Sequence, residues 1–240
     1  MDSIGTIWSY PYNPRAFKQE ALIQHLSLLS CLHSEKVVAA AAVNGLTVDY
    51  APNFVMGKTN RTPEFLTDFP IGRVPTFKSA DGRLTLFESD AIAQYAAESG
   101  PASAQLLGIG VEERATIRQW IGFADHELLE PLTTLILWRY GMADFVEKAE
   151  QAAFSRLHVS LATLEKHLHG RRYIASEQLS LADISLAAGL YWGFAQVIDR
   201  ELRAKYSETT EWYLRVIRDK RLESSIKEDL IEIRKTSPAQ

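Results

Sequence analysis

Residues 72–93 read GRVPTFKSADGRLTLFESDAIA and contain a predicted hairpin followed by a helix. Val74–Phe77 and Leu84–Phe87 are β-favouring runs, and Asp81-Gly82 between them is a turn-forming pair. Ser89 follows the second run and suits the N-cap of a helix, because its hydroxyl can accept a hydrogen bond from a free backbone amide. This stretch therefore predicts two antiparallel strands that lead directly into a helix.

The residues before this hairpin alternate between strand-like and helix-like pieces. Thr6–Tyr10 is one β-favouring run, and Leu46–Asn53 is a second. Between them, Asn13-Pro14 suits the start of a helix and Asn44-Gly45 suits its end. A helix of about thirty residues would be ~45 Å long, which exceeds the ~30 Å width of a small domain. We therefore expect the helix to break near Ser34.

The second half of the chain contains no strand-like run. Apolar residues recur every three or four positions in three long segments, Glu112–Tyr140, Ala143–His169 and Leu181–Val197. The linker-like Ser99-Gly100-Pro101 precedes them. We therefore predict two domains, an α/β domain over residues 1–99 and an all-helical bundle over residues 106–240.

Composition and charge exclude several classes of protein. The 240 residues are 46% apolar and carry 26 basic and 30 acidic side chains, so a core can form and no basic excess attracts nucleic acid or anionic lipid. No apolar run approaches the ~20 residues of a membrane-spanning helix. The single cysteine, Cys31, cannot form an internal disulfide, and no histidine pair has metal-ligand spacing. We expect a cytoplasmic protein that binds no metal, no nucleic acid and no membrane.

The order of strands and helices, followed by a helical bundle, resembles the glutathione transferase superfamily over the whole chain. The resemblance is carried by six stretches: Lys58–Leu66, Phe69-Pro70, Gly72–Pro75, Phe87–Ala93, Trp120–Asp125 and Leu181–Ile184. The subgroup that it resembles most includes the transferase-like module of elongation factor 1B gamma and fungal glutathione transferases of secondary metabolism. The resemblance implies the glutathione transferase fold, with an α/β thioredoxin-like N-terminal domain that binds glutathione and an all-α C-terminal helical bundle.

The resemblance assigns glutathione contacts to the predicted hairpin. In this superfamily the bond before the proline is cis, so that Val74 before Pro75 would pair with the cysteinyl backbone of glutathione. Ser89 at a helix start would hold the γ-glutamyl carboxylate, and Glu88 would meet the ammonium group of the same end. Alternatively, Pro75 is a simple turn proline, and Glu88 and Ser89 are a capping pair without a ligand.

Two further positions match those that hold the glycyl carboxylate of glutathione in the family. These are Arg73 and Asn60. Either could equally be a solvated surface residue, because polar side chains are the usual occupants of loops.

The expected chemistry needs a thiolate, whereas a free thiol titrates near ~8.5, so the site must favour the anion. Resemblance to the asparagine-type transferases assigns this role to Asn13, which is also explained as a helix cap. Ser9, Tyr10 and Tyr12 are rival donors, because hydroxyl groups do this job elsewhere in the superfamily. No cysteine lies in this loop, which makes the cysteine-dependent omega-type transferases a poor match.

Residues 18–35 interrupt the family pattern of the first helix. Their removal would leave RAFKVVAAAAVNGL, an amphipathic helix of ordinary length. A family-specific insertion and a retained intron both fit this observation.

The helical domain is expected to supply the pocket for a second substrate. The candidate lining residues are bulky aromatics on the predicted helices: Trp120, Phe123, Trp138 and Tyr140. Aromatic residues at helical spacing are more often core residues, so each is also a candidate for the core. Ser180 with Asp183 is typical of a capping box, which is structural.

The resemblance therefore implies a glutathione-dependent transferase or double-bond cis-trans isomerase that acts as a homodimer on a small apolar conjugated electrophile, in secondary metabolism. Both reactions begin with addition of the thiolate to the electrophile. The alternative is a non-catalytic docking module of the elongation factor 1B gamma type, bound to other elongation factor subunits. The sequence leaves open the identity of the electrophile and the choice between conjugation and isomerisation.

Overall fold

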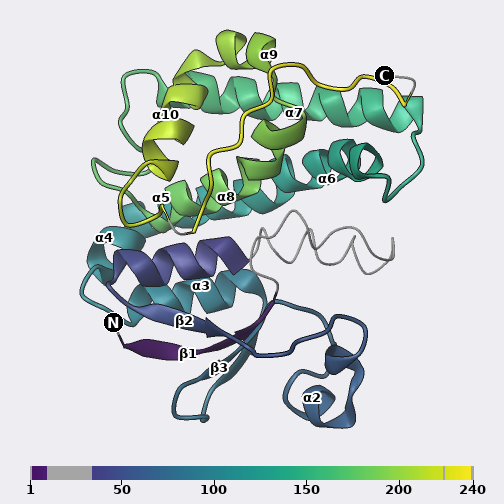
Figure 1. Cartoon of the computed structure of the whole chain (residues 1–240). Coiled ribbons are helices and arrows are strands. Elements are labelled where there is room, and N and C mark those ends of the chain that lie inside the picture. Colours follow the sequence, from purple (N-terminus) through teal and green to yellow (C-terminus); the bar gives the residue numbers. More distant parts are fainter. Residues whose placement is uncertain (1, 10–33, 224, 239–240) are drawn as a thin grey trace. The chain divides into compact units, whose positions relative to one another are not determined.

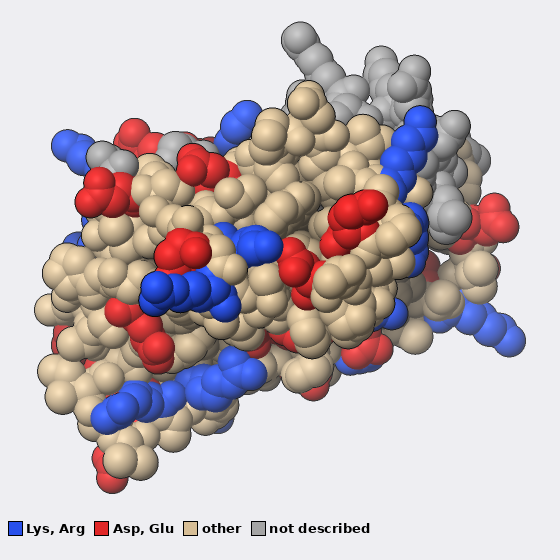
Figure 2. Space-filling model, turned by 90° about the horizontal axis from the view of Figure 1, so that it is seen from below, with Lys and Arg blue, Asp and Glu red and all other residues tan. Residues whose placement is uncertain are grey.

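The computed structural model describes residues 2–9, 34–223 and 225–238 and divides into two compact units, residues 1–104 and 105–240 (Figure 1). Among the described residues, no helix has both the length and the apolar character that crossing a bilayer requires. Basic and acidic side chains are intermingled on the face shown in Figure 2.

The first unit is built on a four-stranded sheet with the order β2-β1-β3-β4. The strands are β1 (Ser3–Trp8), β2 (Thr47–Tyr50), β3 (Thr76–Ser79) and β4 (Thr85–Phe87). β1 runs parallel to β2 and antiparallel to β3, and β3 runs antiparallel to β4. The hairpin predicted from residues 72–93 is confirmed.

The strand ends differ from the predicted ends for physical reasons. β1 begins at Ser3, before the β-favouring run, because Gly5 pairs with Ser79 and this pairing overrides weak local propensity. β2 ends at Tyr50, because Pro52 follows closely and has no amide hydrogen to donate to a ladder.

Helices lie on both faces of this sheet. A helix over residues 34–43 and α3 (Ser89–Glu98) are joined by Asn44, whose side-chain amide donates to the carbonyl oxygens of Ala96 at 2.9 Å and Ala97 at 3.0 Å. Successive β3 residues point to opposite faces: Phe77 packs on Tyr95 of α3, and Lys78 pairs with Asp68 at the end of α2 (Pro63–Asp68). The sheet therefore separates α3 from α2 (Figure 1).

The end of the first helix is as predicted. The helix stops after residue 43, and Gly45 adopts φ 70, a left-handed conformation that glycine tolerates best. Residue 34, where a break is predicted, is the first described helical residue. The predicted start at Asn13-Pro14 and most of the interrupting segment 18–35 lie outside the described residues.

The second unit is helical throughout its regular structure. After α4 (Ser103–Leu107) come α5 (Val111–Phe123), η3 (Ala124–Leu129), α6 (Glu130–Leu137), η4 (Trp138–Tyr140), α7 (Glu147–Leu168), α8 (Leu181–Gln196), α9 (Arg200–Lys205) and α10 (Ser207–Ile217). α8 is buried along nearly its whole length, so it forms the centre of the bundle. Gly193 permits close packing there, because an added Cβ would lie 3.0 Å from Leu132.

The long helix predicted over Glu112–Tyr140 is interrupted by η3, one stretch of π-helix. Pro131 explains the interruption, because it has no N–H to donate to the carbonyl of Glu127 four residues earlier. The Ser160 hydroxyl of α7 donates to that carbonyl instead, at 2.7 Å. Apolar periodicity continues through the proline and therefore did not predict the break.

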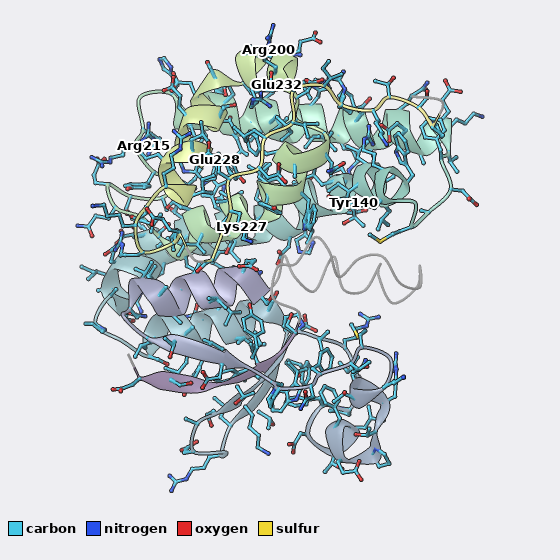
Figure 3. The ribbon with its side chains drawn as sticks, viewed as in Figure 1. Tyr140, Arg200, Arg215, Lys227, Glu228 and Glu232 are labelled. Carbon is cyan, nitrogen blue, oxygen red and sulfur yellow. The ribbon has the colours of Figure 1, made fainter. Side chains whose placement is uncertain are left out.

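Residues 227–236, here named the strap, cross the helical unit without regular structure (Figure 3). The Ile231 amide donates to the Phe194 carbonyl at 3.1 Å, and the Arg200 amide donates to the Glu232 carbonyl at 3.3 Å. Arg203 donates to the Ile231 carbonyl, and Arg139 donates to the carbonyl of Lys235 at 2.7 Å. The strap is thus held through its own backbone and also through its side chains, since Glu228, Glu232 and Arg234 pair with Arg218, Arg203 and Asp199, respectively.

Candidate functional site

A hollow of about 170 Å³ opens in the first unit beside the Val74-Pro75 bond, which is cis. Its walls come from the loop after α2, the start of β3, the end of β4 and the start of α3. The lining residues are Phe69, Ile71, Gly72, Arg73, Val74, Pro75, Thr76, Phe87, Glu88 and Ser89. Five of the six residues predicted to bind glutathione are therefore brought together in one place; Asn60 is the exception.

Asn60 supports the loop instead of lining the hollow. Its side chain is 1% exposed, its Oδ1 accepts from the Gly57 amide at 2.6 Å, and its Nδ2 donates to the Gly72 carbonyl at 2.6 Å. Gly72 has φ 63, and a Cβ there would lie 2.9 Å from the Asn60 carbonyl oxygen. Both polar atoms of the Asn60 side chain are therefore used within the first unit, and its direct contact with a ligand stays a prediction.

The start of α3 forms one wall of the hollow. Ser89 is the first residue of the helix, and Glu88 precedes it as the N-cap, one position earlier than predicted. Glu88 has φ 70, an uncommon conformation for a residue with a side chain, and its side chain does not cap the helix. The carboxylate of Glu88 is therefore left exposed at the wall instead of being used by the fold.

The polar side chains of the hollow lack partners. Arg73 and Glu88 are exposed and Ser89 is buried, and the side chains of these three residues make no hydrogen bond or ion pair with any residue within the described ranges. Asp90 differs, because it forms an ion pair with the buried Lys36 of the helix over residues 34–43. A cation, an anion and a hydroxyl thus remain available to a zwitterionic ligand.

Five lining residues, among them Ile71, Thr76 and Phe87, were not predicted as site residues from the sequence. Ile71 and Phe87 are large apolar side chains that stay 50% and 43% exposed, and Thr76 is a buried polar residue. The register of the hairpin places Thr76 opposite Phe87. The sequence signal for them is their position next to the Val74-Pro75 and Glu88-Ser89 motifs.

The candidates for thiol activation are only partly described. Ser9 follows β1 directly and is 3% exposed. Tyr10, Tyr12 and Asn13 lie outside the described residues. Their role at the sulfur therefore stays a prediction.

The aromatic candidates of the helical unit form two groups. Trp120 packs on Phe123 and on His167, with ring centres 5.0 Å and 4.4 Å apart, respectively. Trp138 is buried and donates from Nε1 to Glu150 at 2.7 Å.

Tyr140 lies in the same short helix as Trp138, η4 (Figure 3). Its ring is edge-on to that of Trp192, with ring centres 5.2 Å apart. Trp120 instead borders a broad groove between α5 and α7 that Val159, Thr163 and Lys166 also line. Which of the four aromatic residues contacts a second substrate stays a prediction.

The capping box at the start of α8 is confirmed as structural. Asp183 accepts from the Ser180 amide at 2.9 Å and from the Ser180 hydroxyl at 2.7 Å. It also accepts from the Ile174 amide and the Trp212 indole, both at 2.9 Å. Over the residues that the structure places, no group of His, Cys, Asp and Glu side chains has a metal-binding arrangement.

Comparison with known proteins adds independent evidence. The family model "Glutathione S-transferase, N-terminal domain" matches residues 26–98, and the family model "Glutathione S-transferase, C-terminal domain" matches residues 128–220. A glutathione S-transferase-like protein of Aspergillus aculeatus is 44% identical over 204 residues, which are 83% of this chain and 95% of that protein. Elongation factor 1-gamma of Carassius auratus is 33% identical over 210 residues, which are 88% of this chain and 43% of that protein.

The likeness extends to solved structures. The glutathione transferase URE2P6 from Phanerochaete chrysosporium, in complex with oxidized glutathione, is 18% identical, covers 93% of this chain and 94% of its own, and has a TM-score of 0.75. The predicted fold, a thioredoxin-like α/β domain followed by an all-helical domain, is confirmed. The chain belongs to the glutathione S-transferase family.

Proposed function

We propose that this protein is a glutathione-dependent enzyme whose peptide substrate binds in the hollow beside Val74-Pro75. The observation that carries the proposal is the set of unpartnered polar groups on the walls of that hollow. A concave site with a few convergent polar groups that the fold does not use is the usual form of a ligand-binding site. Glutathione is a tripeptide with one ammonium group and two carboxylates. The ammonium group is complementary to the anion of the set, and the carboxylates are complementary to its cation and its hydroxyl.

The residues fit the peptide in three ways. Val74 precedes β3 and lies outside its ladder, so its backbone can pair with an extended peptide as an added strand would. Glu88 can accept from the ammonium group, and Ser89 at the positive end of α3 can donate to a carboxylate. Arg73 can pair with the second carboxylate.

Glutathione supplies a thiol that, once ionised, adds to an electrophile. The chain must therefore lower the pKa of that thiol, and Asn13, Tyr12 and Ser9 remain our candidates for this task, by donating a hydrogen bond to the sulfur. Asn13 at a helix start would add the field of the helix dipole.

For the second substrate we propose a small, apolar, conjugated electrophile, which is either conjugated or isomerised after thiolate addition. The similarity to fungal glutathione S-transferase-like proteins supports a transferase of the fungal subgroup that the sequence resembles, and we propose a role in secondary metabolism. We propose that the enzyme acts in the cytoplasm as a homodimer, because isologous pairs are the commonest assembly. Light scattering that gives a monomer mass at tens of micromolar would count against the dimer.

A second candidate function is that of a docking module in the translation elongation complex. The match to elongation factor 1-gamma over 88% of this chain favours it. That function needs a partner-facing surface and no peptide site, so it leaves the unpartnered groups of the hollow unexplained.

Calorimetric titration with millimolar glutathione tests the enzyme proposal. Wild type should release or absorb heat on binding, and Ser89→Ala should weaken binding by about 1.5–3 kcal/mol through loss of a charge-assisted hydrogen bond. Ser99→Ala at the other end of α3 is the matched control and should bind normally. No heat with wild type, together with co-purification of elongation factor subunits, would favour the docking module.

A further inference from the structure

Thr76 is buried beside the hollow with an unsatisfied hydroxyl. It follows Pro75 directly, begins β3, lines the hollow and is 1% exposed. Within the described part of the first unit, its Oγ1 is the one side-chain oxygen or nitrogen that is itself out of contact with solvent and has no hydrogen-bond partner. Leaving such a group unpaired is unfavourable, because it loses its water on folding and gains nothing in return.

Packing alone does not account for a threonine at this position. The residues opposite Thr76 are Trp8 on β1 and Phe87 on β4, and cross-strand partners share one face of the sheet. Both neighbours are aromatic and offer a largely apolar surface. Valine has the same shape as threonine and would bury a methyl group there in place of the hydroxyl.

We propose that Thr76 is an additional binding residue of the hollow, whose hydroxyl hydrogen-bonds a backbone amide or carbonyl of the bound tripeptide next to Val74. This inference rests on the proposed function. A hydroxyl both donates and accepts, so it serves a neutral peptide group, whereas Arg73, Glu88 and Ser89 serve the charged ends. The unpaired hydroxyl of the free protein becomes paired when the peptide is bound.

In Thr76→Val, the melting temperature of the free protein and the affinity for glutathione should change in opposite directions. The free variant should melt at a higher temperature than wild type, because an unsatisfied buried hydroxyl has been replaced by a methyl group. Its affinity for glutathione should nevertheless fall about three- to tenfold, the size of one neutral hydrogen bond. In turnover, KM for glutathione should rise while kcat changes little, because the contact is made in the ground state as well as in the transition state.

Two variants serve as controls in calorimetry and thermal unfolding. Thr76→Ser keeps the hydroxyl and should retain wild-type affinity within about twofold. Thr85→Val changes a half-buried threonine of β4 that does not line the hollow, so affinity should not change. Wild-type affinity in Thr76→Val overturns this inference and leaves the proposed function intact. Absence of glutathione binding by wild type overturns both.

Discussion

The hollow of the first unit and the core of the helical unit use the same kinds of polar side chain in opposite ways. In the helical unit, the buried Asp183 accepts hydrogen bonds on both carboxylate oxygens. In the hollow, the side chains of Arg73, Glu88 and Thr76 make no hydrogen bond or ion pair with the described residues. Asp183 is used by the fold, whereas Arg73 and Glu88 lie in a hollow that a ligand can reach.

Arg139 illustrates the partnered case. Its guanidinium donates to Glu150 at 2.6 Å and to the carbonyl of Lys235 in the strap at 2.7 Å, and it lies 4.3 Å over the Trp138 ring. A charge that is satisfied from several sides has little left for a ligand.

The largest expected effect is on stability, in Asp183→Ala. The change leaves the Ile174 amide, the Ser180 amide and the Trp212 indole buried without an acceptor, and should lower the free energy of unfolding by about 3–5 kcal/mol. Urea denaturation measures this loss. Asp229→Ala in the exposed part of the strap is the control and should have little effect. A loss below about 1 kcal/mol would contradict the structural role assigned to Asp183.

Arg139→Met should have the next largest effect, about 2–4 kcal/mol, because it leaves the largely buried Glu150 without its cation. Amides of the strap near Lys235 should also exchange hydrogen faster, since the bond from Arg139 to the Lys235 carbonyl is lost. Arg156→Met removes an exposed cation paired with Glu130 and should disturb neither readout appreciably. Unchanged exchange in the strap would show that Arg139 does not hold it.

Glu88→Gln should produce the reverse pattern. Because Glu88 has no partner to lose, the free energy of unfolding should change by less than about 0.5 kcal/mol. Binding of glutathione should weaken by about 1.5–3 kcal/mol, through loss of the charge-assisted bond to the ammonium group. Glu98→Gln, at the far end of α3, is the matched control for calorimetry. If Glu88→Gln strongly destabilised the protein and still bound glutathione normally, Glu88 would be a structural residue like Asp183, and the two regions would not differ as described.

The smallest effect concerns acid stability and His158, a partnered but half-buried group. Burial lowers the pKa of His158, and the nearby Lys205 and Arg234 lower it further. His158 therefore takes up a proton at higher pH in the unfolded chain than in the folded protein. The stability that neutral His158 contributes is fully present above the unfolded pKa of about 6.5, and it is lost as the pH falls below that value. Melting temperatures between pH 5 and 7.5 should converge for His158→Gln and wild type as acid is added, apart from the lost bond to Tyr206.

His169→Gln is the control for that pH series, because His169 is exposed at the end of α7. Its melting curve should follow wild type throughout. A steeper acid loss in His158→Gln than in wild type would contradict the lowered pKa.

Local signals predicted the parts of the fold that depend on neighbouring residues. The hairpin, the end of the helix at Asn44-Gly45 and the box of Ser180 with Asp183 are short-range features, and all three appear. The π-helical stretch before Pro131 was missed, because its carbonyl partner, Ser160, lies on another helix. Sequence spacing does not report such a partner.

The same limit applies to the site. The motif around Val74 placed most of the hollow correctly, but Asn60 was expected to face a ligand. Whether a polar side chain points inward depends on distant atoms, here the carbonyl of Gly72. Thr76 was overlooked for the converse reason, since a missing partner is visible only when all neighbours are known.

The backbone grip on the strap has an evolutionary consequence. Arg203 and Arg139 bind the carbonyl oxygens of Ile231 and Lys235, and every amino acid supplies such an oxygen. Substitutions in the strap therefore leave these bonds intact, whereas substitution of either arginine removes them. We expect Ile231 and Lys235 to vary freely among homologues while the two arginines stay fixed, because these bonds depend on side chains that lie outside the strap.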